Sequence, residues 1–299
     1  MNESPFFTPL NLEKQKAERF QDELRLLGVE QLTITSRNSQ KIRDPNVKII
    51  LCLGGFTETG EATFGSMADK LATDPNIAVL LFSTPGSSES TFTTDELKKE
   101  QTFSAQNYAQ LIRLYLERIA IKPDLIIGHS FGAVAATQMD SPNKVLLAPA
   151  FKLTESFKLV ISQLIKKKEK GEVLDDNYVA FLTTILGQLP DNFAENINAI
   201  PVEALQKVFK GLLEIQPVTF NPEDQMVSYY SKGEQREQQK MGRPRTITVG
   251  DEKVIDASAI PSEITTIQLT QGGHNAHLIQ ENELLICDEI IGMLQRSTL

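Results

Sequence analysis

The sequence predicts an α/β fold, a mainly parallel, doubly wound sheet with an inserted helical cap. Short, almost wholly apolar runs recur along the 299 residues, as expected of strands that are buried on both faces. Segments with helical periodicity alternate with these runs, and this alternation indicates parallel strands covered by helices. The alternation stops between 151 and 240, where amphipathic helical stretches and prolines follow one another.

Taken in order, the elements begin with an amphipathic helix over 12–27, which Gly28 follows as a C-terminal glycine. A strand of alternating character is expected at 29–35. Six apolar runs then predict strands at 47–53, 77–82, 125–127, 144–147, 246–249 and 264–269. Helical periodicity between and after them predicts helices at 62–71, 97–120, 133–139 and 278–294.

The segment 151–240 is expected to form a helical cap over one end of the sheet. It carries helical stretches at 157–170, 177–186 and 202–213 and no convincing buried strand. The length alone allows two domains or one large domain with an insertion, and the element order favours the second. The predicted core domain therefore comprises 1–150 and 241–299. Packing on the sheet and lining of an acyl pocket are both open explanations for the apolar residues of the cap.

Composition excludes several classes of protein. The 39 acidic residues outnumber the 30 basic ones, so the net charge is −9, and no basic stripe offers the phosphate contacts of a nucleic-acid binder. Cys52 and Cys287 lie in apolar runs without CxxC spacing, so we expect reduced, buried thiols and a cytoplasmic location. The first residues lack the pattern of a secretory signal, and no apolar stretch approaches the roughly 20 residues of a membrane span. We therefore expect no integral membrane association, and the oligomeric state stays open.

A predicted strand runs into the pattern G-x-S-x-G at Gly128, Ser130 and Gly132, and a helix rich in small residues follows. A nucleophile on so tight a turn from strand to helix requires small neighbours two positions away on either side, because the flanking elements approach closely. The helix directs its N-terminal amides at the site where negative charge develops during acyl transfer. Ser130 is therefore the predicted nucleophile.

A serine hydroxyl needs a base to remove its proton, and the chain contains only three histidines. His129 adjoins Ser130, so its side chain should point away from the nucleophile. His274 follows two glycines after the last predicted strand, at the edge where open α/β sheets gather their sites. His277 lies at the start of the closing helix, where a capping or packing role is expected. His274 is therefore the predicted base, with His277 as the alternative.

A carboxylate should orient the base, and it should come from the loop after the preceding strand. Three acids lie in the loop at 249–256: Asp251, Glu252 and Asp256. Asp251 has the commoner residue type for this role and is our choice, whereas Glu252 has the better spacing to the following Val-Ile pair. Asp256 lies further along, where it is expected to cap the next element. Spacing alone does not decide among them.

The order of nucleophile, acid and Gly-Gly-His resembles the α/β-hydrolase superfamily over about 29–296. The resemblance implies Ser130 as nucleophile and His274 as base, with an oxyanion hole formed by the backbone amides of Phe56 and Phe131. Gly54 stands where the family usually has His, and Lys253 where an Asp is expected. The segment 82–90 is similar to the family's D-x-P-G loop, with Ser83 in place of the Asp. A serine at the elbow argues against the dehalogenases and epoxide hydrolases of this fold, which use Asp.

These features predict a serine hydrolase that cleaves a carboxylic ester or thioester of a small-molecule acyl substrate. An acyltransferase, a peptidase or a C–C bond hydrolase on the same triad is the alternative, as is a non-catalytic binding protein of the same fold. The reaction requires neither a metal nor an organic cofactor, and none of the three histidines pairs with a cysteine or a spaced set of carboxylates. We therefore expect no cofactor.

Overall fold

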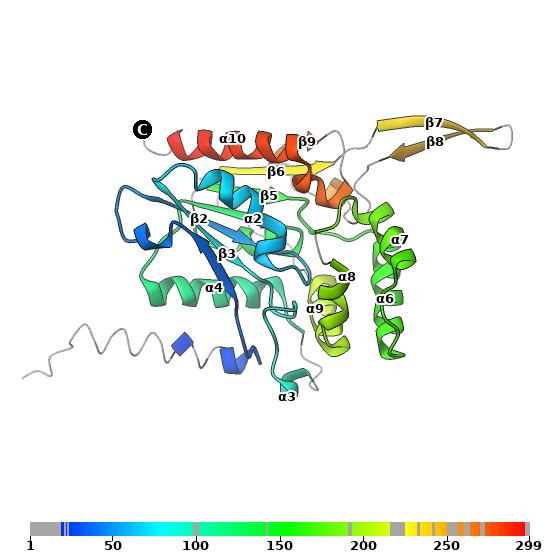
Figure 1. The fold of residues 1–299 in the computed structure, drawn as a ribbon, viewed down its shortest axis with the longest axis horizontal. Helices are drawn as coiled ribbons and strands as arrows, with labels where there is room; N and C mark the ends of the chain where they lie inside the picture. The colour runs from blue at the N-terminus through cyan, green and yellow to red at the C-terminus, as the bar shows by residue number, and fades with distance from the viewer. Residues whose placement is uncertain are drawn as a thin grey trace, which may run out of the picture.

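A computed structural model describes residues 19–20, 22, 24–97, 102–141, 143–190, 193–215, 225–231, 234–240, 243–249, 254, 257–259, 264–269 and 273–296. Its centre is a seven-stranded sheet with the strand order β1-β3-β2-β4-β5-β6-β9 (Figure 1). The strands are β1 (Ile34–Arg37), β2 (Lys48–Leu53), β3 (Ile77–Phe82), β4 (Leu125–His129), β5 (Asn143–Leu147), β6 (Gln225–Ser231) and β9 (Thr265–Leu269). Only β1 is antiparallel to its neighbour, β3, and all other pairings in this sheet are parallel.

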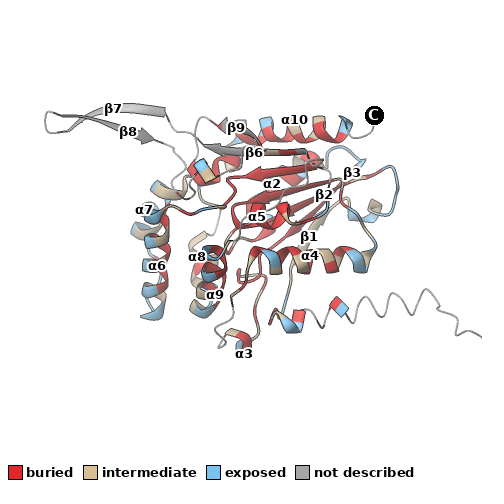
Figure 2. Ribbon diagram, turned by 180° about the vertical axis from the view of Figure 1, so that it is seen from behind, coloured by how far each residue is buried: buried red, intermediate tan, exposed pale blue. Residues whose placement is uncertain are grey.

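The sheet is covered on both faces, as the apolar runs predict. Along β2, Ile49 and Leu51 belong to one hydrophobic cluster, whereas Ile50 and Cys52 belong to the other, because successive side chains point to opposite faces. Helices α4 (Ala105–Ile119) and α5 (Phe131–Thr137) pack into the first cluster, and α2 (Gly60–Leu71) and α10 (Gln280–Arg296) pack into the second. Figure 2 shows buried residues along central strands such as β2 and β3 and on the inner faces of these helices. The doubly wound α/β architecture is confirmed.

Four helices gather at the end of the sheet toward which β6 points (Figure 1). They are α6 (Glu155–Glu169), α7 (Asp176–Leu186), α8 (Phe193–Ala199) and α9 (Val202–Leu213). Ile161 of α6 and Val208 of α9 are buried in the same cluster as α4 and α5, so these helices share the core of the sheet. The shorter elements are α3 (Thr94–Leu97) and the 3₁₀ turns η1 (Ser39–Lys41), η2 (Ala257–Ala259) and η3 (Gly273–Leu278).

Two sequence predictions about the sheet are wrong. The segment 151–240 was expected to hold no sheet strand, but β6 pairs in parallel with both β5 and β9. Its sequence, QMVSYYS, mixes polar and apolar residues and lacks the continuous apolar run of a central strand. The run 246–249 does form a strand, but this strand, β8 (Arg243–Val249), pairs antiparallel with β7 (Glu234–Lys240) in a separate two-stranded sheet.

Most other elements agree with their predictions apart from their ends, but the helix expected at 97–120 is reduced to α4, because 102–104 are not helical and α3 ends at Leu97. The leading helix is present in the part of 19–26 that the structure describes, and its expected start at 12 lies outside the described residues. The strand expected at 29–35 is limited to β1, preceded by an isolated bridge between Val29 and Phe92. Helix α8 has no counterpart in the prediction. Cys52 and Cys287 are buried free thiols, as expected.

Candidate active site

Ser130 occupies a strained turn between β4 and α5. Its φ and ψ of 51° and −113° lie outside the regions that side-chain-bearing residues favour, and such strain is concentrated at functional sites. The two glycines make this turn possible. A Cβ on Gly132 would lie 2.2 Å from the carbonyl oxygen of Leu53, and one on Gly128 would lie 2.5 Å from the Cα of Ala133. The close approach that the G-x-S-x-G pattern predicts is therefore present.

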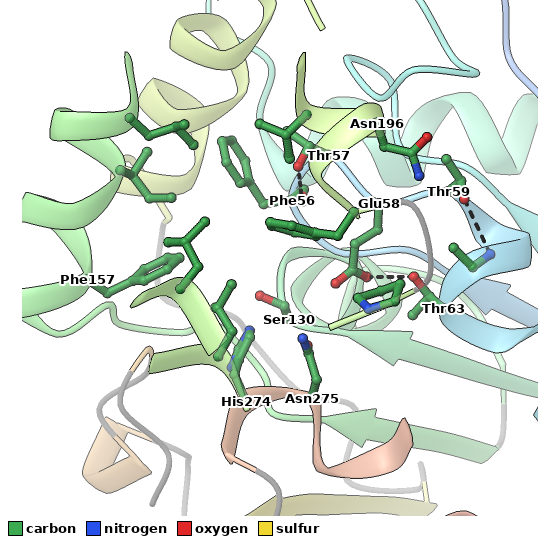
Figure 3. A pocket seen from close by; sticks show the side chains of 18 residues that line it. Phe56, Thr57, Glu58, Thr59, Thr63, Ser130, Phe157, Asn196, His274 and Asn275 are labelled. Carbon is green, nitrogen blue, oxygen red and sulfur yellow. Dashed lines mark hydrogen bonds between the residues drawn. The ribbon is translucent and has the colours of Figure 1, made fainter. Parts of the chain in front are cut away.

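Ser130 and His274 line the same cavity, together with residues of α6, α7 and α8 (Figure 3). The cavity encloses about 810 Å³ of empty space, part of it open to solvent. Both side chains are nearly buried, with 4% of Ser130 and 5% of His274 exposed. The structure thus brings the predicted nucleophile and the predicted base together, although 144 positions separate them in the sequence.

His277 does not line this cavity. It is buried between Phe64 of α2 and His129, with ring centroids 5.9 and 4.4 Å away. Burial lowers the pKa of His277 well below its ordinary value, and the neighbouring His129 and His274 lower it further. Among the described residues, Nε2 of His277 has no hydrogen-bond partner. This position fits the packing role that the sequence suggests for His277.

The three candidates for the triad acid, Asp251, Glu252 and Asp256, lie outside the described residues. Val254, in the same loop, is described and fully buried. Its carbonyl oxygen accepts a hydrogen bond of 2.8 Å from the backbone amide of Thr154, which caps α6. On α6, the ring of Phe157 lies 6.4 Å from that of His274. Val254 is therefore anchored beside the helix that borders the predicted base.

The loop after β2 carries the predicted oxyanion donor Phe56, whose side chain lines the cavity. Gly54 replaces the family's usual His, and Thr84 supports the loop in this structure. Its Oγ1 lies 2.8 Å from the carbonyl oxygen of Gly54 and 2.6 Å from that of Gly55. Phe131, the other predicted donor, begins α5, where backbone amides have no partner within the helix. Both segments therefore border Ser130.

Ser83, at the position of the family's Asp, has a structural role. Its hydroxyl accepts a hydrogen bond from the Gly60 amide at 2.9 Å and donates to Glu89 at 2.8 Å. This joins the start of α2 to the loop after β3.

Glu58, an acid in the wall of the cavity, is not among the residues that the sequence patterns indicate. Its carboxylate lies 2.8 Å from Nδ1 of His129 and accepts a hydrogen bond of 2.6 Å from the Gly55 amide. Burial would raise the pKa of Glu58, but the charge and hydrogen bond of His129, the Gly55 amide and the charge of His274 together lower it. The sequence signal that could have indicated Glu58 is that it is the single acid in the short loop directly after the buried strand β2.

The cavity has an apolar wall and a polar wall. The apolar wall comes mainly from three of the helices over the sheet end, α6, α7 and α8: Phe157, Ile161, Leu164, Leu182, Leu186, Phe193 and Ile197. The polar wall contains Glu58, Thr59, Thr63, Asn196 and Asn275, which Figure 3 shows around Ser130 on the side away from Phe157. Asn275 Nδ2 donates to the carbonyl oxygen of Gln188 at 2.9 Å, so η3 is tied to the segment after α7. This arrangement suits a ligand with one apolar and one polar end.

In the part of the chain that the structure describes, no three His, Cys, Asp or Glu side chains are arranged to hold a metal ion. None of the helices in this part combines the length and the apolar character needed to cross a membrane.

Known structures with the same fold include several hydrolases. The chain resembles MGS-M2, an alpha/beta hydrolase enzyme from a Medee basin deep-sea metagenome library, with a TM-score of 0.64, 13% identity and 88% and 94% of the two chains covered. It also resembles the esterase EaEST from Exiguobacterium antarcticum, with a TM-score of 0.60, 10% identity and 88% and 95% coverage. The enol-lactonase from Burkholderia xenovorans LB400 gives a TM-score of 0.59, 11% identity and 88% and 96% coverage. At these identities the likeness shows the fold alone.

No curated protein sequence matches this chain. The model of the Alpha/beta hydrolase family does match, over residues 50–281. This match spans most of the sheet, the elbow at Ser130, the four helices and the segment of His274, so the chain belongs to the alpha/beta hydrolase family.

Proposed function

We propose that this protein is a serine hydrolase that cleaves a carboxylic ester or thioester through an acyl-enzyme on Ser130. The main support for this proposal is that Ser130 occupies a strained turn and lines the same cavity as His274. Membership of the alpha/beta hydrolase family supports hydrolysis as the reaction class.

In the proposed first step, His274 takes the proton of the Ser130 hydroxyl while Oγ attacks the substrate carbonyl carbon. The backbone amides of Phe56 and Phe131 hold the resulting oxyanion, a contribution worth several kcal/mol when both donors are in place. His274 then gives its proton to the departing alcohol or thiol, and the acyl group stays on Ser130.

In the second step, His274 takes a proton from water, and the oxygen of that water attacks the acyl carbon. The tetrahedral intermediate collapses with release of the carboxylic acid, and Ser130 Oγ regains its proton from His274. A carboxylate in the loop 249–256, with Asp251 as first choice and Glu252 and Asp256 as alternatives, orients the imidazole and stabilises its cation.

The four helices α6 to α9 act in this proposal as the cap of the site. Apolar side chains of α6, α7 and α8 form the wall of the cavity opposite Glu58 and Asn275, so the apolar part of the substrate lies against the cap. Medium-length acyl esters and thioesters fit this division better than strongly charged acyl groups do, because an unpaired charge against an apolar wall loses its hydration.

The test is labelling with a fluorophosphonate probe together with turnover of an ester and thioester panel. Wild type is expected to be labelled and active, and Ser130→Ala and His274→Ala are expected to lose both properties. Ser162→Ala, on α6, is the matched control, because Ser162 only donates to the carbonyl oxygen of Lys158. An unlabelled, inactive but folded wild type would contradict the proposal and favour a binding protein. Product that forms only when an alcohol or amine acceptor is added would favour an acyltransferase.

The acid is tested by the series Asp251→Asn, Glu252→Gln and Asp256→Asn. Loss of the carboxylate from a catalytic triad lowers kcat by about 10⁴-fold. One of the three variants is therefore expected to have a far lower kcat than the other two. Full activity of Asp251→Asn would transfer the role to whichever of the other two variants loses activity.

A further inference from the structure

We propose that Glu58 and His129 form a lasting carboxylate–imidazolium pair, and that this pair is a positioning unit for the active site. Its role in positioning rests on the proposed function, whereas its charge state does not. The pair links three segments that are far apart in the sequence: the loop after β2, the end of β4 and the η3 turn.

The geometry favours two protons on the His129 ring. Nδ1 lies 2.9 Å from Oε2 of Glu58, and Nε2 lies 3.2 Å from the carbonyl oxygen of His274. A carbonyl oxygen only accepts hydrogen bonds, and so does an ionised carboxylate. A neutral imidazole donates from one nitrogen only, so it would leave the other nitrogen's lone pair facing an oxygen. The imidazolium satisfies both partners.

The contacts of Glu58 favour its ionised form over a protonated carboxyl that donates to His129. Oε2 accepts from the Gly55 amide at 2.6 Å and from the Thr63 hydroxyl at 3.2 Å. Hydrogen bonds donated to a carboxylate stabilise its charge. The net lowering of the pKa of Glu58 is in the same direction.

The described surroundings of His129 provide an anion, Glu58, to pair with an imidazolium. The rings of His274 and His277, both on η3, lie 4.8 and 4.4 Å from the His129 ring. His277 stays neutral, because burial and the two neighbouring imidazoles lower its pKa. On α4, Tyr108 lies within electrostatic reach of Glu58, and burial raises the pKa of its phenol, which stays neutral as well. Glu58 is thus the carboxylate that balances the charge of fully buried His129.

Through the backbone, the pair can position the oxyanion donor, the nucleophile and the base of the proposed reaction. Glu58 holds the peptide of Gly55, which precedes the oxyanion donor Phe56, and His129 directly precedes Ser130. Nε2 of His129 holds the carbonyl of the base residue His274. Because a misplacement of about 1 Å between reacting groups can cost about 100-fold in rate, loss of the pair is expected to lower kcat more than it changes KM.

The charge state is tested by nitrogen NMR of the protein labelled with ¹⁵N-histidine. The chain has only three histidines, so His274→Gln and His277→Gln assign the His129 ring by elimination. Protons are expected on both ring nitrogens of His129 throughout pH 6–9, and His129 in Glu58→Gln is expected to be neutral above about pH 6.5. A neutral His129 ring in wild type at pH 7 would overturn the proposal without any reference to activity.

The positioning role is tested by kinetics of Glu58→Gln, His129→Gln and the double variant. Glu58→Gln is expected to lower kcat about 100-fold with little change in KM, and the double variant is expected to be no slower than the slower single variant. Glu61→Gln is the matched control, since Glu61 lies three positions further on and pairs with Arg37 near the surface. If wild type is active and Glu58→Gln equals it in kcat, the positioning role is refuted and the proposed function stands. If Ser130→Ala keeps full activity, the proposed function fails, and the NMR result still decides the charge state.

Discussion

The substitution Gly132→Ala tests whether close contact between α5 and β2 builds the serine turn. The added Cβ would lie 2.2 Å from the carbonyl oxygen of Leu53 and 2.4 Å from that of Gly54. Both atoms belong to the backbone, so no side-chain rotation relieves the overlap. Ordinary contact distances would require the start of α5 to move away from β2 by about 1 Å.

The expected cost follows from two opposing effects. Replacing glycine by alanine in a helix contributes up to about 1 kcal/mol of stability. Forcing an extra carbon into a close-packed site costs about 1–3 kcal/mol, and the contact with two backbone oxygens places this case at the upper end. The net loss is about 2 kcal/mol, which lowers Tm by about 3 °C in a chain of 299 residues. A shift of about 1 Å in the Phe131 amide would also lower kcat by about 100-fold.

Gly65→Ala, in the middle of α2, is the matched control. The three atoms nearest to its added Cβ all belong to the side chain of Glu61, whose Oε1 lies 2.8 Å away and pairs with Arg37. A partly exposed side chain can shift together with its partner at less cost than the backbone can, so Tm is expected to stay the same or rise by about 2 °C, with unchanged turnover. Thermal unfolding and ester turnover of both variants provide the measurement. Equal Tm and kcat for Gly132→Ala and wild type would refute the reasoning from close packing.

Three further predictions concern acid stability, substrate length and helix capping. His277 is neutral in the folded protein, whereas it takes up a proton below about pH 6.5 when unfolded, so it lowers stability by up to about 1.4 kcal/mol per pH unit as the pH falls from 6.5. His277→Gln should therefore flatten the dependence of Tm on pH between 6.5 and 5, and an unchanged slope would contradict this assignment. Phe193→Ala removes apolar surface from the cavity wall, so it should lower kcat/KM for a hexanoyl ester about tenfold more than for an acetyl ester. The control is Phe181→Ala, on the exposed side of α7, which should lower kcat/KM for the two esters equally or not at all. Ser104→Ala removes the capping box of α4 and should cost about 1 kcal/mol in urea unfolding while turnover is unchanged; equal unfolding midpoints would show that the cap is unimportant.

Much of the sheet and the central pair of the site could be predicted from the sequence. The strands β2, β3 and β4 are buried on both faces, so they require continuous apolar runs, and such runs are visible locally. The turn at Ser130 requires small residues at fixed positions, which gives a local pattern too. His274 could be chosen as the candidate base because only three histidines are present, and it directly follows two glycines after the last predicted strand, whereas His277 lies at the start of the closing helix.

The sequence could not indicate which strands pair or which distant side chains meet. The polar residues of β6 hide its place in the sheet, whereas the apolar run of β8 suggests a place that it does not hold, because sheet membership depends on the partner strand. Glu58 and His129 are 71 positions apart, and 145 positions separate His129 from His274. The sequence by itself determined the alternation of strands and helices, the turn for Ser130 and the choice of base, because each leaves a local pattern. Only the tertiary structure decided strand pairing, the two walls of the cavity and the contact of Glu58 with His129, because these depend on how separate segments pack together.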